Sequence, residues 1–387
     1  MKVLLILNEA PLPFSSAASR WYYSLITSLE KQSNVELTLI AGCQHAEAVA
    51  EAEKLYPNGK FFLYPKKKGR LSKLSTILRP FSYSISDEMK LAVSEYSKKV
   101  DLIHVEQTFA AWACTDIDNR HLLSIHYLSR IDLVEAETVN LKDWIIVKLM
   151  MITEKRLIKK FVHLKTCSER LSNFLRNNDQ VDNVTNFPFA IDIEKYNFLS
   201  DANRKRTNTI TIIANMGWYP GKSAALNMFN HIWPLIKLEK KDLKLRIVGW
   251  NAKKVLSNYL NLEDVEILEN VPDIREYFYN ADALFYFPSK GSGIKIKVQE
   301  AMLFGLPVIT NAEGAEGLNL IDGIHGIVDD NVASIIEKSI KLLQSPDLQN
   351  NLRRNARKLI EDTCNIETVI HKQMELYHSI LKRNVDE

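Results

Sequence analysis

Two glycines, two lysines and a glutamate lie close together in the second half of the chain. The run Gly291-Ser292-Gly293-Ile294-Lys295-Ile296-Lys297 is followed three residues later by Glu300. Backbone N–H groups at the start of a helix have no partner within it and, with the helix dipole, favour an anion. The lysines would add positive charge, and a carboxylate can accept hydrogen bonds from hydroxyl groups. These residues would suit a diphosphate flanked by sugars, although a short glycine motif alone also fits an ordinary strand–helix crossover.

The segments around this run predict how it is positioned. Residues 283–287 are apolar and predict a buried strand, and residues 308–310 predict another. Between them apolar residues recur at helical spacing until Gly305 and Pro307, which are stop signals. The unit is therefore predicted to be strand, turn, helix and strand, with the turn opening the helix.

The rest of the chain alternates strands and helices in the same way. Predicted strands are 3–7, 37–41, 61–64, 102–105, 122–125, 163–166, 209–214, 243–248, 265–268, 283–287, 308–310 and 326–328. Predicted helices are 17–31, 46–55, 87–98, 133–161, 169–177, 223–238, 274–280, the one after Gly291, and three at the C-terminus, the last 367–381. Such alternation indicates parallel sheets covered on both faces, that is, doubly wound α/β domains.

Length and composition favour a two-domain soluble or peripheral protein. The chain has 387 residues, 46% hydrophobic and 25% charged, with a net charge of +3 that does not suggest a nucleic-acid binder. The four cysteines are far apart, without metal-like spacing, and are expected to be reduced thiols in a cytoplasmic protein. The N-terminal apolar run is too short for a signal peptide, and no run approaches the roughly 20 residues of a membrane span.

Two basic stretches carry interleaved apolar residues. Residues 60–79 hold seven lysines and arginines among aromatic and aliphatic side chains, which would suit docking on anionic lipid headgroups. A solvated basic loop is the equal alternative. The helix over 142–160 has the same ambiguity, and we expect its apolar face, including Trp144 and Ile145, to be core.

Residues 291–318 resemble the donor-site signature of glycosyltransferase family 4, most closely the subgroup that elongates bacterial surface polysaccharides. Three upstream segments resemble the corresponding parts of the family: 214–220, 246–249, and 271–274 with 281–283. The similarity covers residues 210–320, whereas the N-terminal half agrees in pattern only.

The resemblance implies a GT-B fold, with two Rossmann-like domains facing a cleft. The expected domains are 1–196 on the acceptor side and 209–365 on the nucleotide-sugar side, joined by a linker at 197–208, with a final helix at 366–387 crossing back to the N-terminal domain. It also implies a metal-independent transfer of a hexose-type unit that retains the anomeric configuration. No cofactor is expected beyond the nucleotide diphosphate sugar, and no acidic D-x-D pair is present to hold a metal. The acceptor would be a glycan or a lipid-linked glycan.

The resemblance also assigns site residues. His126, after a predicted strand, and Lys295 are the candidate catalytic residues, and Glu106 is a candidate on the acceptor side. The candidate donor-binding residues are Arg20, Asn215, Gly249, Ile274, Ser292, Gly293, Ile294, Lys295, Lys297 and Glu300. Each has a structural alternative: Lys297 could pair with Glu300 one turn on, His126 could be a satisfied histidine at a strand end, and Arg20 could bind local carboxylates.

The sequence departs from the family pattern at three places, and two of them, Ser292 and the first loop, leave a second function open. Ser292 stands where most relatives have a glutamate that touches the donor sugar. Asn215 and Gly217 occupy a turn that usually carries phosphate-binding basic residues, and Ser15-Ser16 replaces glycines in the first loop. The alternative is a non-catalytic GT-B protein that acts as partner or scaffold of another glycosyltransferase.

Overall fold

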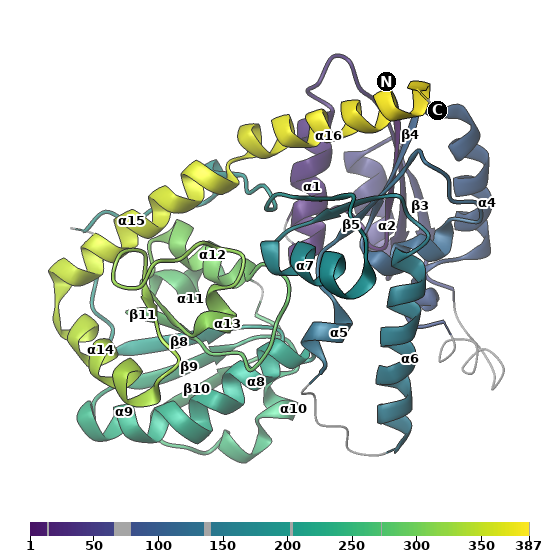
Figure 1. The fold of residues 1–387 in the computed structure, drawn as a ribbon. Helices are drawn as coiled ribbons and strands as arrows, with labels where there is room; N and C mark the ends of the chain where they lie inside the picture. Colours follow the sequence, from purple (N-terminus) through teal and green to yellow (C-terminus); the bar gives the residue numbers. More distant parts are fainter. Residues whose placement is uncertain (14, 66–78, 135–140, 202–203, 272, 387) are drawn as a thin grey trace. The chain divides into compact units, whose positions relative to one another are not determined.

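A computed structural model of the chain (Figure 1) describes residues 1–13, 15–65, 79–134, 141–201, 204–271 and 273–386. The described chain divides into two compact units. Unit 1 comprises Met1–Arg130, Glu137–Ile191 and Cys364–Glu387, and unit 2 comprises Ile131–Ala136 and Asp192–Thr363.

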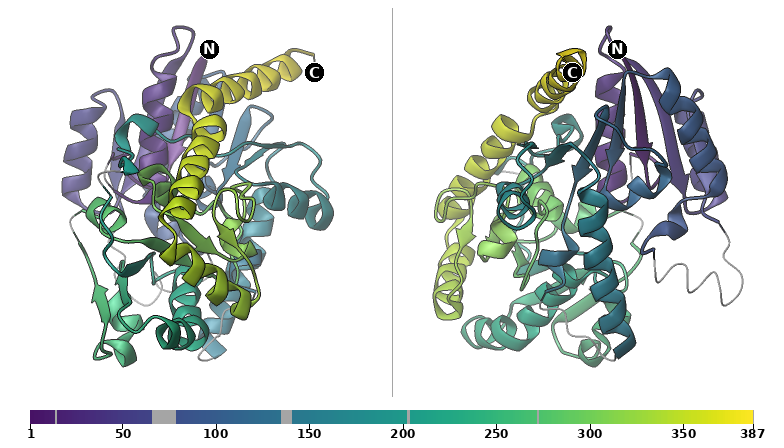
Figure 2. Two further views of the ribbon diagram at one scale, coloured as in Figure 1. Left: turned by 90° about the vertical axis from the view of Figure 1, so that its left-hand side faces the viewer. Right: turned by 45° about the vertical axis from the view of Figure 1, so that its right-hand side comes forward.

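Unit 1 contains a seven-stranded parallel sheet in the order β3-β2-β1-β4-β5-β6-β7. Its strands are β1 (Lys2–Leu7), β2 (Glu36–Cys43), β3 (Lys60–Leu63), β4 (Leu102–Glu106), β5 (His121–Ile125), β6 (His163–Thr166) and β7 (Val184–Asn186). Every residue of β4, β5 and β6 is buried, as expected for central strands covered on both faces. Figure 2 shows the strands of this sheet side by side.

Helices complete unit 1. They are α1 (Ala17–Leu29), α2 (Ala46–Leu55), α4 (Asp87–Tyr96), α6 (Leu141–Ile158), α7 (Glu169–Phe174) and α16 (Ile366–Asp386). Ser16 is the N-cap of α1: its hydroxyl accepts a hydrogen bond from the Ser19 N–H and satisfies one free donor of the first turn. The C-terminal helix α16 packs against α1, and its Tyr377 is completely buried, so α16 is part of the core of unit 1 (Figure 1).

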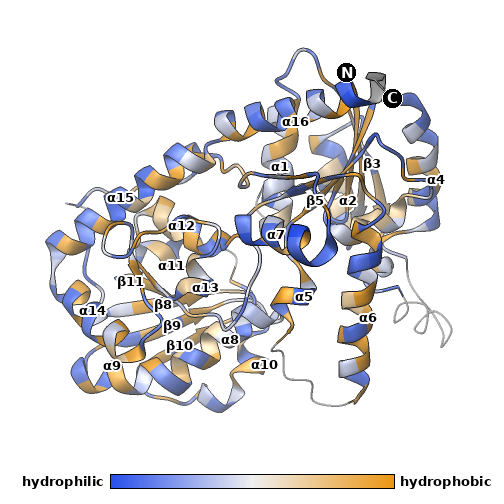
Figure 3. Cartoon of the chain, viewed as in Figure 1, coloured by the Kyte–Doolittle hydropathy of each residue, from blue (hydrophilic) through white to orange (hydrophobic). Residues whose placement is uncertain are grey.

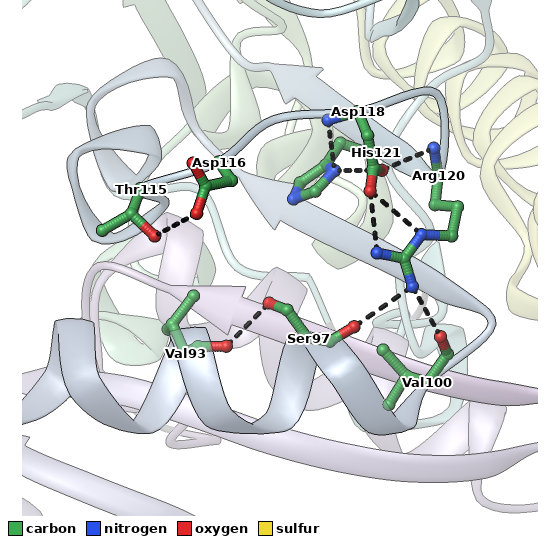
Figure 4. Close-up of polar contacts among 8 residues, drawn as sticks. All are labelled: Val93, Ser97, Val100, Thr115, Asp116, Asp118, Arg120 and His121. Atoms are coloured by element: carbon green, nitrogen blue, oxygen red, sulfur yellow. Dashed lines mark hydrogen bonds and ion pairs between the residues drawn. The ribbon is translucent and has the colours of Figure 1, made fainter.

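The loop before β5 is fixed by a cluster of charged side chains (Figure 4). Arg120 donates to the carbonyls of Ser97 and Val100, each at 3.1 Å, and pairs with Asp118. The same carboxylate lies 2.9 Å from Nδ1 of His121. Burial opposes the ionisation of Asp118, but these partners hold the pKa of its carboxyl below the usual value. The cluster therefore ties the end of the α4 segment to the first residue of β5.

Unit 2 contains a six-stranded parallel sheet in the order β10-β9-β8-β11-β12-β13. Its strands are β8 (Thr209–Ile213), β9 (Lys244–Val248), β10 (Val265–Leu268), β11 (Ala283–Tyr286), β12 (Val308–Thr310) and β13 (Ile327–Val328). Its helices are α8 (Tyr219–Asn227), α9 (Trp233–Glu239), α10 (Ala252–Val255), α11 (Arg275–Tyr279), α12 (Ile296–Phe304), α13 (Ala312–Ala315), α14 (Val332–Gln344) and α15 (Pro346–Cys364). The predicted pair of parallel-sheet α/β domains is therefore confirmed.

Arginines bind the C-terminal end of α12. The helix ends at Gly305, whose φ of 70° lies in the left-handed region that glycine adopts without strain. The Gly305 carbonyl accepts hydrogen bonds from Arg353 and Arg204, both at 2.9 Å. Arg357 binds the Leu303 carbonyl at 2.7 Å. Guanidinium groups here satisfy free carbonyls and complement the negative end of the helix dipole, which holds α12 firmly in unit 2.

Three element predictions differ from the structure. Within the helix predicted over 133–161 the structure describes α6; Leu133 and Val134 form a turn after α5 (Ser129–Asp132), and residues 135–140 lie outside the described residues. The helix predicted over 223–238 starts earlier and is divided into α8 and α9 by a π-helical turn before Trp233 and Pro234. Strand β7 was not predicted, because only Val184 of its three residues is apolar.

Candidate functional site

The carboxyl ends of three neighbouring strands bring the predicted donor-binding residues of unit 2 to one edge of the sheet. Asn215 follows β8, Gly249 follows β9, and the run Gly291–Lys297 lies between β11 and α12. Strand β8 pairs with both β9 and β11, so these segments emerge next to one another. Ligands of parallel α/β sheets bind at this edge, and the structure therefore supports treating the segments as one candidate site.

The Gly291–Lys297 run forms an irregular turn before the helix. Helix α12 begins at Ile296 with Lys295 as its N-cap, so the prediction that the turn itself opens the helix is wrong by about one helical turn. Lys295 is buried, and its Nζ donates to the Gly293 carbonyl at 2.5 Å. A Cβ at Gly291 would lie 2.9 Å from the same Nζ. Glycine at position 291 thus lets the ammonium group fold back over the turn.

A carboxylate already binds the turn. Asp132 belongs to unit 2, and its Oδ1 accepts hydrogen bonds from the Ser292 backbone N–H at 2.7 Å and from the Ser292 hydroxyl at 2.5 Å. Its Oδ2 accepts a hydrogen bond from Nε1 of Trp218 at 3.2 Å. Burial raises the pKa of the Asp132 carboxyl, while the Ser292 donors and Lys295 oppose that rise. The Ser292 donors of this turn are therefore used by a side chain of the chain itself, and the anion that the sequence predicted there remains a prediction.

Glu300 lies in α12 with only 3% of its surface exposed. Its Oε2 pairs with Nζ of Lys297 at 2.8 Å, and its Oε1 accepts a hydrogen bond from the Tyr196 hydroxyl at 3.3 Å. The pairing of Lys297 with Glu300 is the structural alternative that the sequence left open. In this arrangement Lys297 supports the buried carboxylate and is not placed as an independent anion ligand.

The remaining donor-site predictions are backbone positions or turn residues. The Asn215 Oδ1 accepts a hydrogen bond from the Gly217 N–H at 2.8 Å and shapes the turn after β8. A Cβ at Gly249 would overlap the Ala214 carbonyl, so only glycine fits where these two segments approach. Ile274 is the N-cap residue of α11. Ile294, within the Gly291–Lys297 turn, is buried.

In unit 1, Glu106 and His126 follow the adjacent strands β4 and β5 and meet directly. The His126 Nε2 donates a hydrogen bond to Oε2 of Glu106, because an ionised carboxylate can only accept. The Trp21 Nε1 donates to the same oxygen at 3.2 Å. The ring of Phe189 packs edge-on against His126, with 4.5 Å between centroids. Glu106 therefore fixes the tautomer and the ring orientation of His126.

The sequence did not predict the buried groups around Glu106. Nε2 of His104 lies 3.1 Å from Oε1 of Glu106, and Nδ1 of His104 accepts a hydrogen bond from the Tyr377 hydroxyl at 2.7 Å. Burial alone would raise the pKa of Glu106, but the two imidazoles outweigh it and hold that pKa well below the usual value. Burial lowers the pKa of His104, which is consistent with a neutral ring that accepts from Tyr377.

Lys165, in β6, is the cation of this cluster. It is 1% exposed, and its ammonium has no hydrogen-bond partner among the described residues. The ammonium lies over the rings of Trp21 and Phe187, at 4.6 and 4.5 Å from their centroids. Burial lowers the pKa of Lys165, and Glu106 opposes that change. Lys165 and Glu106 thus place opposite charges together in the interior of unit 1.

Arg20 lies in the second turn of α1, in unit 1, where its Nη1 donates to the Ser15 carbonyl at 2.9 Å. Residues 66–78, the greater part of the basic stretch 60–79, lie outside the described residues, so its predicted contact with a membrane is not tested. In the described part of the chain, no group of three or more His, Cys, Asp or Glu side chains is arranged to hold a metal ion. Nor does any helix described there have the length and apolarity needed to cross a membrane.

Sequence reasoning missed Asp132, His104, Lys165, Tyr196 and Tyr377. Asp132 lies 160 positions from Ser292, and Tyr377 lies 273 positions from His104, so no local pattern links either pair. A signal was available for two of the five. His104 and Lys165 are polar residues inside the apolar runs of predicted strands, and such residues need a buried partner.

Comparisons with known proteins agree with this architecture. Residues 207–345, which lie in unit 2, match the family model of Glycosyl transferases group 1. An uncharacterized glycosyltransferase of Haemophilus influenzae is 22% identical over 337 residues, which covers 78% of this chain and 82% of the relative. Trehalose synthase of Thermococcus litoralis is 28% identical over 142 residues, covering 34% of this chain and 32% of that protein.

Solved structures share the fold across the whole chain. Sucrose-phosphate synthase of Thermosynechococcus elongatus superposes with a TM-score of 0.73 at 13% identity, covering 99% of both chains. HepE of Anabaena, in complex with UDP and glucose, gives a TM-score of 0.66 at 14% identity, covering 98% of this chain and 100% of that one. The two parallel-sheet domains are therefore those of the GT-B fold, as the sequence predicted. Residues 207–345 therefore resemble group 1 glycosyltransferases in sequence, and the chain has the GT-B fold.

Proposed function

We propose that the protein transfers a hexose-type sugar from a nucleotide diphosphate sugar to a glycan or lipid-linked glycan acceptor. The reaction belongs to the synthesis of a bacterial surface polysaccharide, retains the anomeric configuration and proceeds without a metal ion or other cofactor. The family match supports the use of a sugar donor, and the resemblance of residues 291–318 supports the subgroup. The protein acts in the cytoplasm, at the inner face of the membrane where a lipid-linked acceptor would lie.

The observation that carries this proposal is the composition of the turn before α12. The Ser292 N–H and hydroxyl both point to a bound carboxylate oxygen, and the Lys295 ammonium folds over the same turn. These groups would stabilise the negative charge that develops on a leaving diphosphate. In this assignment the turn and Lys295 bind the diphosphate, and Glu300 accepts hydrogen bonds from the ribose hydroxyls.

His126 is assigned to the transferred sugar. Its ring is held by Glu106 and Phe189, and it retains a small exposed surface of 8%. A ring with a fixed tautomer can present a single defined hydrogen-bonding atom to a sugar hydroxyl. Anomeric retention is tested by following the product of the first turnovers with proton NMR, where an inverted anomer would contradict the proposal.

Titration calorimetry with a panel of nucleoside diphosphates tests the donor site, followed by a donor-hydrolysis screen with common nucleotide sugars. We expect one nucleotide to bind and Lys295→Met to weaken its affinity at least tenfold. Lys341→Met, which removes an exposed lysine of α14, is the matched control and should bind normally. Normal binding by Lys295→Met would contradict the assignment of the diphosphate site.

The second candidate is a non-catalytic GT-B partner or scaffold of another glycosyltransferase. The contact of Asp132 with Ser292 favours it, because a carboxylate occupies the donors that a diphosphate would use. This candidate predicts that no nucleoside diphosphate binds, even at millimolar concentration, while the wild-type protein remains folded. Binding in the panel experiment would contradict it.

A further inference from the structure

Helix α6 exposes a face made of apolar and basic side chains. Four large apolar residues on this face are well exposed: Leu141 at 72%, Trp144 at 48%, Ile145 at 41% and Ile152 at 47%. Their positions follow helical spacing, so they form one stripe along the helix. The prediction that the apolar side of this helix is core is wrong for Trp144 and Ile145, which point to solvent.

The stripe is accompanied by positive charge. Lys148, Lys155 and Arg156 share the same side of α6 by helical spacing, and Lys142, Lys159 and Lys160 are exposed beside it or just after it. The Lys148 ammonium lies 5.8 Å from the centroid of the Trp144 ring. Lys155 also pairs with Asp179 at 3.1 Å, which leaves the other basic residues to carry most of the charge of this face.

Negative charge lies on the opposite side of the helix. The acidic residues of α6 are Asp143 and Glu154, both about half a turn of the helix away from the stripe. Glu154 is fully buried, where it accepts a hydrogen bond from the Ser129 N–H at 2.7 Å and pairs with Arg130 at 3.1 Å. The exposed face is therefore apolar and cationic, with no acidic side chain of α6 on it.

A different face anchors α6 to unit 1. Met150, Thr153, Leu157 and Ile158 are buried on that side and contribute to the core. The exposed apolar residues are therefore not needed to hold the helix in place. Single exposed hydrophobic residues are common in soluble proteins, but an aligned stripe of them beside basic residues marks an interaction surface. Figure 3 shows the hydrophobic positions of α6 among hydrophilic ones.

We propose that this face of α6 docks on an anionic lipid bilayer, with Leu141, Trp144, Ile145 and Ile152 inserted at the level of the headgroups. Helices that lie in a membrane interface combine an apolar stripe with lysines and arginines, and tryptophan favours the interface. The basic side chains would pair with lipid phosphates while their hydrocarbon stems lie along the stripe. The inference rests on the proposed function, because it supplies the contact that brings a membrane-bound acceptor to the enzyme.

Co-sedimentation with vesicles tests the surface directly. The full chain is mixed with vesicles of pure phosphatidylcholine or of phosphatidylcholine containing about a third phosphatidylglycerol. We expect binding to the anionic vesicles that is weakened by high salt, and at least tenfold weaker binding by Trp144→Glu/Ile145→Glu. Leu91→Glu is the matched control, because Leu91 is 72% exposed on α4 of the same unit and lies outside the proposed face.

A second variant separates charge from apolar insertion. Lys148→Glu should reduce binding to anionic vesicles several-fold while leaving the apolar stripe intact. Circular dichroism and nucleoside diphosphate binding of the same variants are measured in solution. Failure of the proposed function would abolish nucleotide binding in all proteins, whereas failure of this inference would appear only with vesicles. Unchanged binding of Trp144→Glu/Ile145→Glu to anionic vesicles, or no binding of the wild type at low salt, would overturn the inference. If the face instead binds an acidic protein, the wild type should not bind the anionic vesicles at low salt.

Discussion

One oxygen of Asp132 accepts two hydrogen bonds from Ser292, one from the backbone and one from the side chain. This is the geometry in which a phosphate oxygen would be bound by a serine turn. The carboxylate therefore competes with any anion that uses the same donors, and its negative charge repels that anion as well. We therefore expect nucleotide affinity to depend on Asp132, a residue that does not belong to the glycine-containing run.

We expect Asp132→Ala to bind nucleoside diphosphate about three- to tenfold more tightly than wild type, because the Ser292 donors are released and a negative charge is removed. Asp132→Asn removes the charge but keeps an oxygen that can accept from Ser292, so its gain should be smaller. Calorimetric titration of the three proteins at one salt concentration measures the difference. Weaker binding by Asp132→Ala would show that the carboxylate supports the site and does not compete with the ligand.

Glu300→Gln should separate ribose binding from diphosphate binding. The carboxylate is buried beside Lys297 and Tyr196, so its replacement should weaken nucleoside diphosphate binding about tenfold, equivalent to about 1.4 kcal/mol. Affinity for inorganic pyrophosphate should change little, because pyrophosphate has no ribose. Lys295→Met, in contrast, should weaken both ligands. An equal loss of both ligands in Glu300→Gln would contradict its assignment to the ribose.

Glu106→Gln should destabilise the protein by about 3 kcal/mol, because it leaves the buried Lys165 ammonium without its opposite charge. Urea unfolding followed by circular dichroism measures the loss. Adding Lys165→Met to Glu106→Gln removes the unpaired charge, and the double variant should recover part of the stability. If Lys165→Met brings no recovery of stability, the charge of Glu106 does not stabilise the buried ammonium of Lys165.

His104 should make stability depend on pH. Burial places its folded pKa below the usual 6.5, so the unfolded chain binds the proton more readily. The free energy of unfolding should therefore fall as the pH drops from 7.5 through 6.5, by at most about 1.4 kcal/mol per pH unit for this group. Unfolding titrations at several pH values measure the slope.

The variant His104→Gln isolates that contribution. Other groups add their own slopes: burial also lowers the pKa of His121, and the lowered pKa of Glu106 produces a loss of stability only in more acidic solution. We expect a shallower dependence between pH 7.5 and 5.5 in the variant than in wild type. The same slope in both proteins would mean that His104 does not titrate differently in the folded and unfolded chains. Glu106, Lys165, His126 and Tyr377 surround His104 and should be unchanged in this comparison.

Sequence patterns predicted the strands well because buried parallel strands are short apolar runs. Residues 163–166, 265–268 and 308–310 were predicted with the bounds that the structure has. Helix bounds were less predictable where packing and polar contacts decide them. Asp132 ends α5 and binds Ser292, so the apolar pattern that continues beyond it does not correspond to one continuous helix.

The candidate site was predictable only where its residues are neighbours in sequence. The spacing of Lys297 and Glu300 predicted their ion pair as one of two alternatives, since residues three apart share a helix face. The order of strands in the parallel sheet brings Asn215, Gly249 and Gly291 to one edge. The alternation of strands and helices in the sequence had predicted such a parallel sheet. The carboxylate of Asp132 and the cluster of Glu106, His104 and Lys165 depend on tertiary packing, which no local pattern records.

The interruption of unit 1 by unit 2 has a consequence for biosynthesis. The chain leaves unit 1 at Ile191 and returns at Cys364, whose carbonyl accepts a hydrogen bond from the Ile191 N–H at 2.9 Å. A ribosome therefore completes all of unit 2 before it makes α16. Until then His104 lacks the Tyr377 hydroxyl, and α1 lacks the helix that packs against it. Unit 1 is therefore begun first, but it can complete its core only after the second unit has been translated.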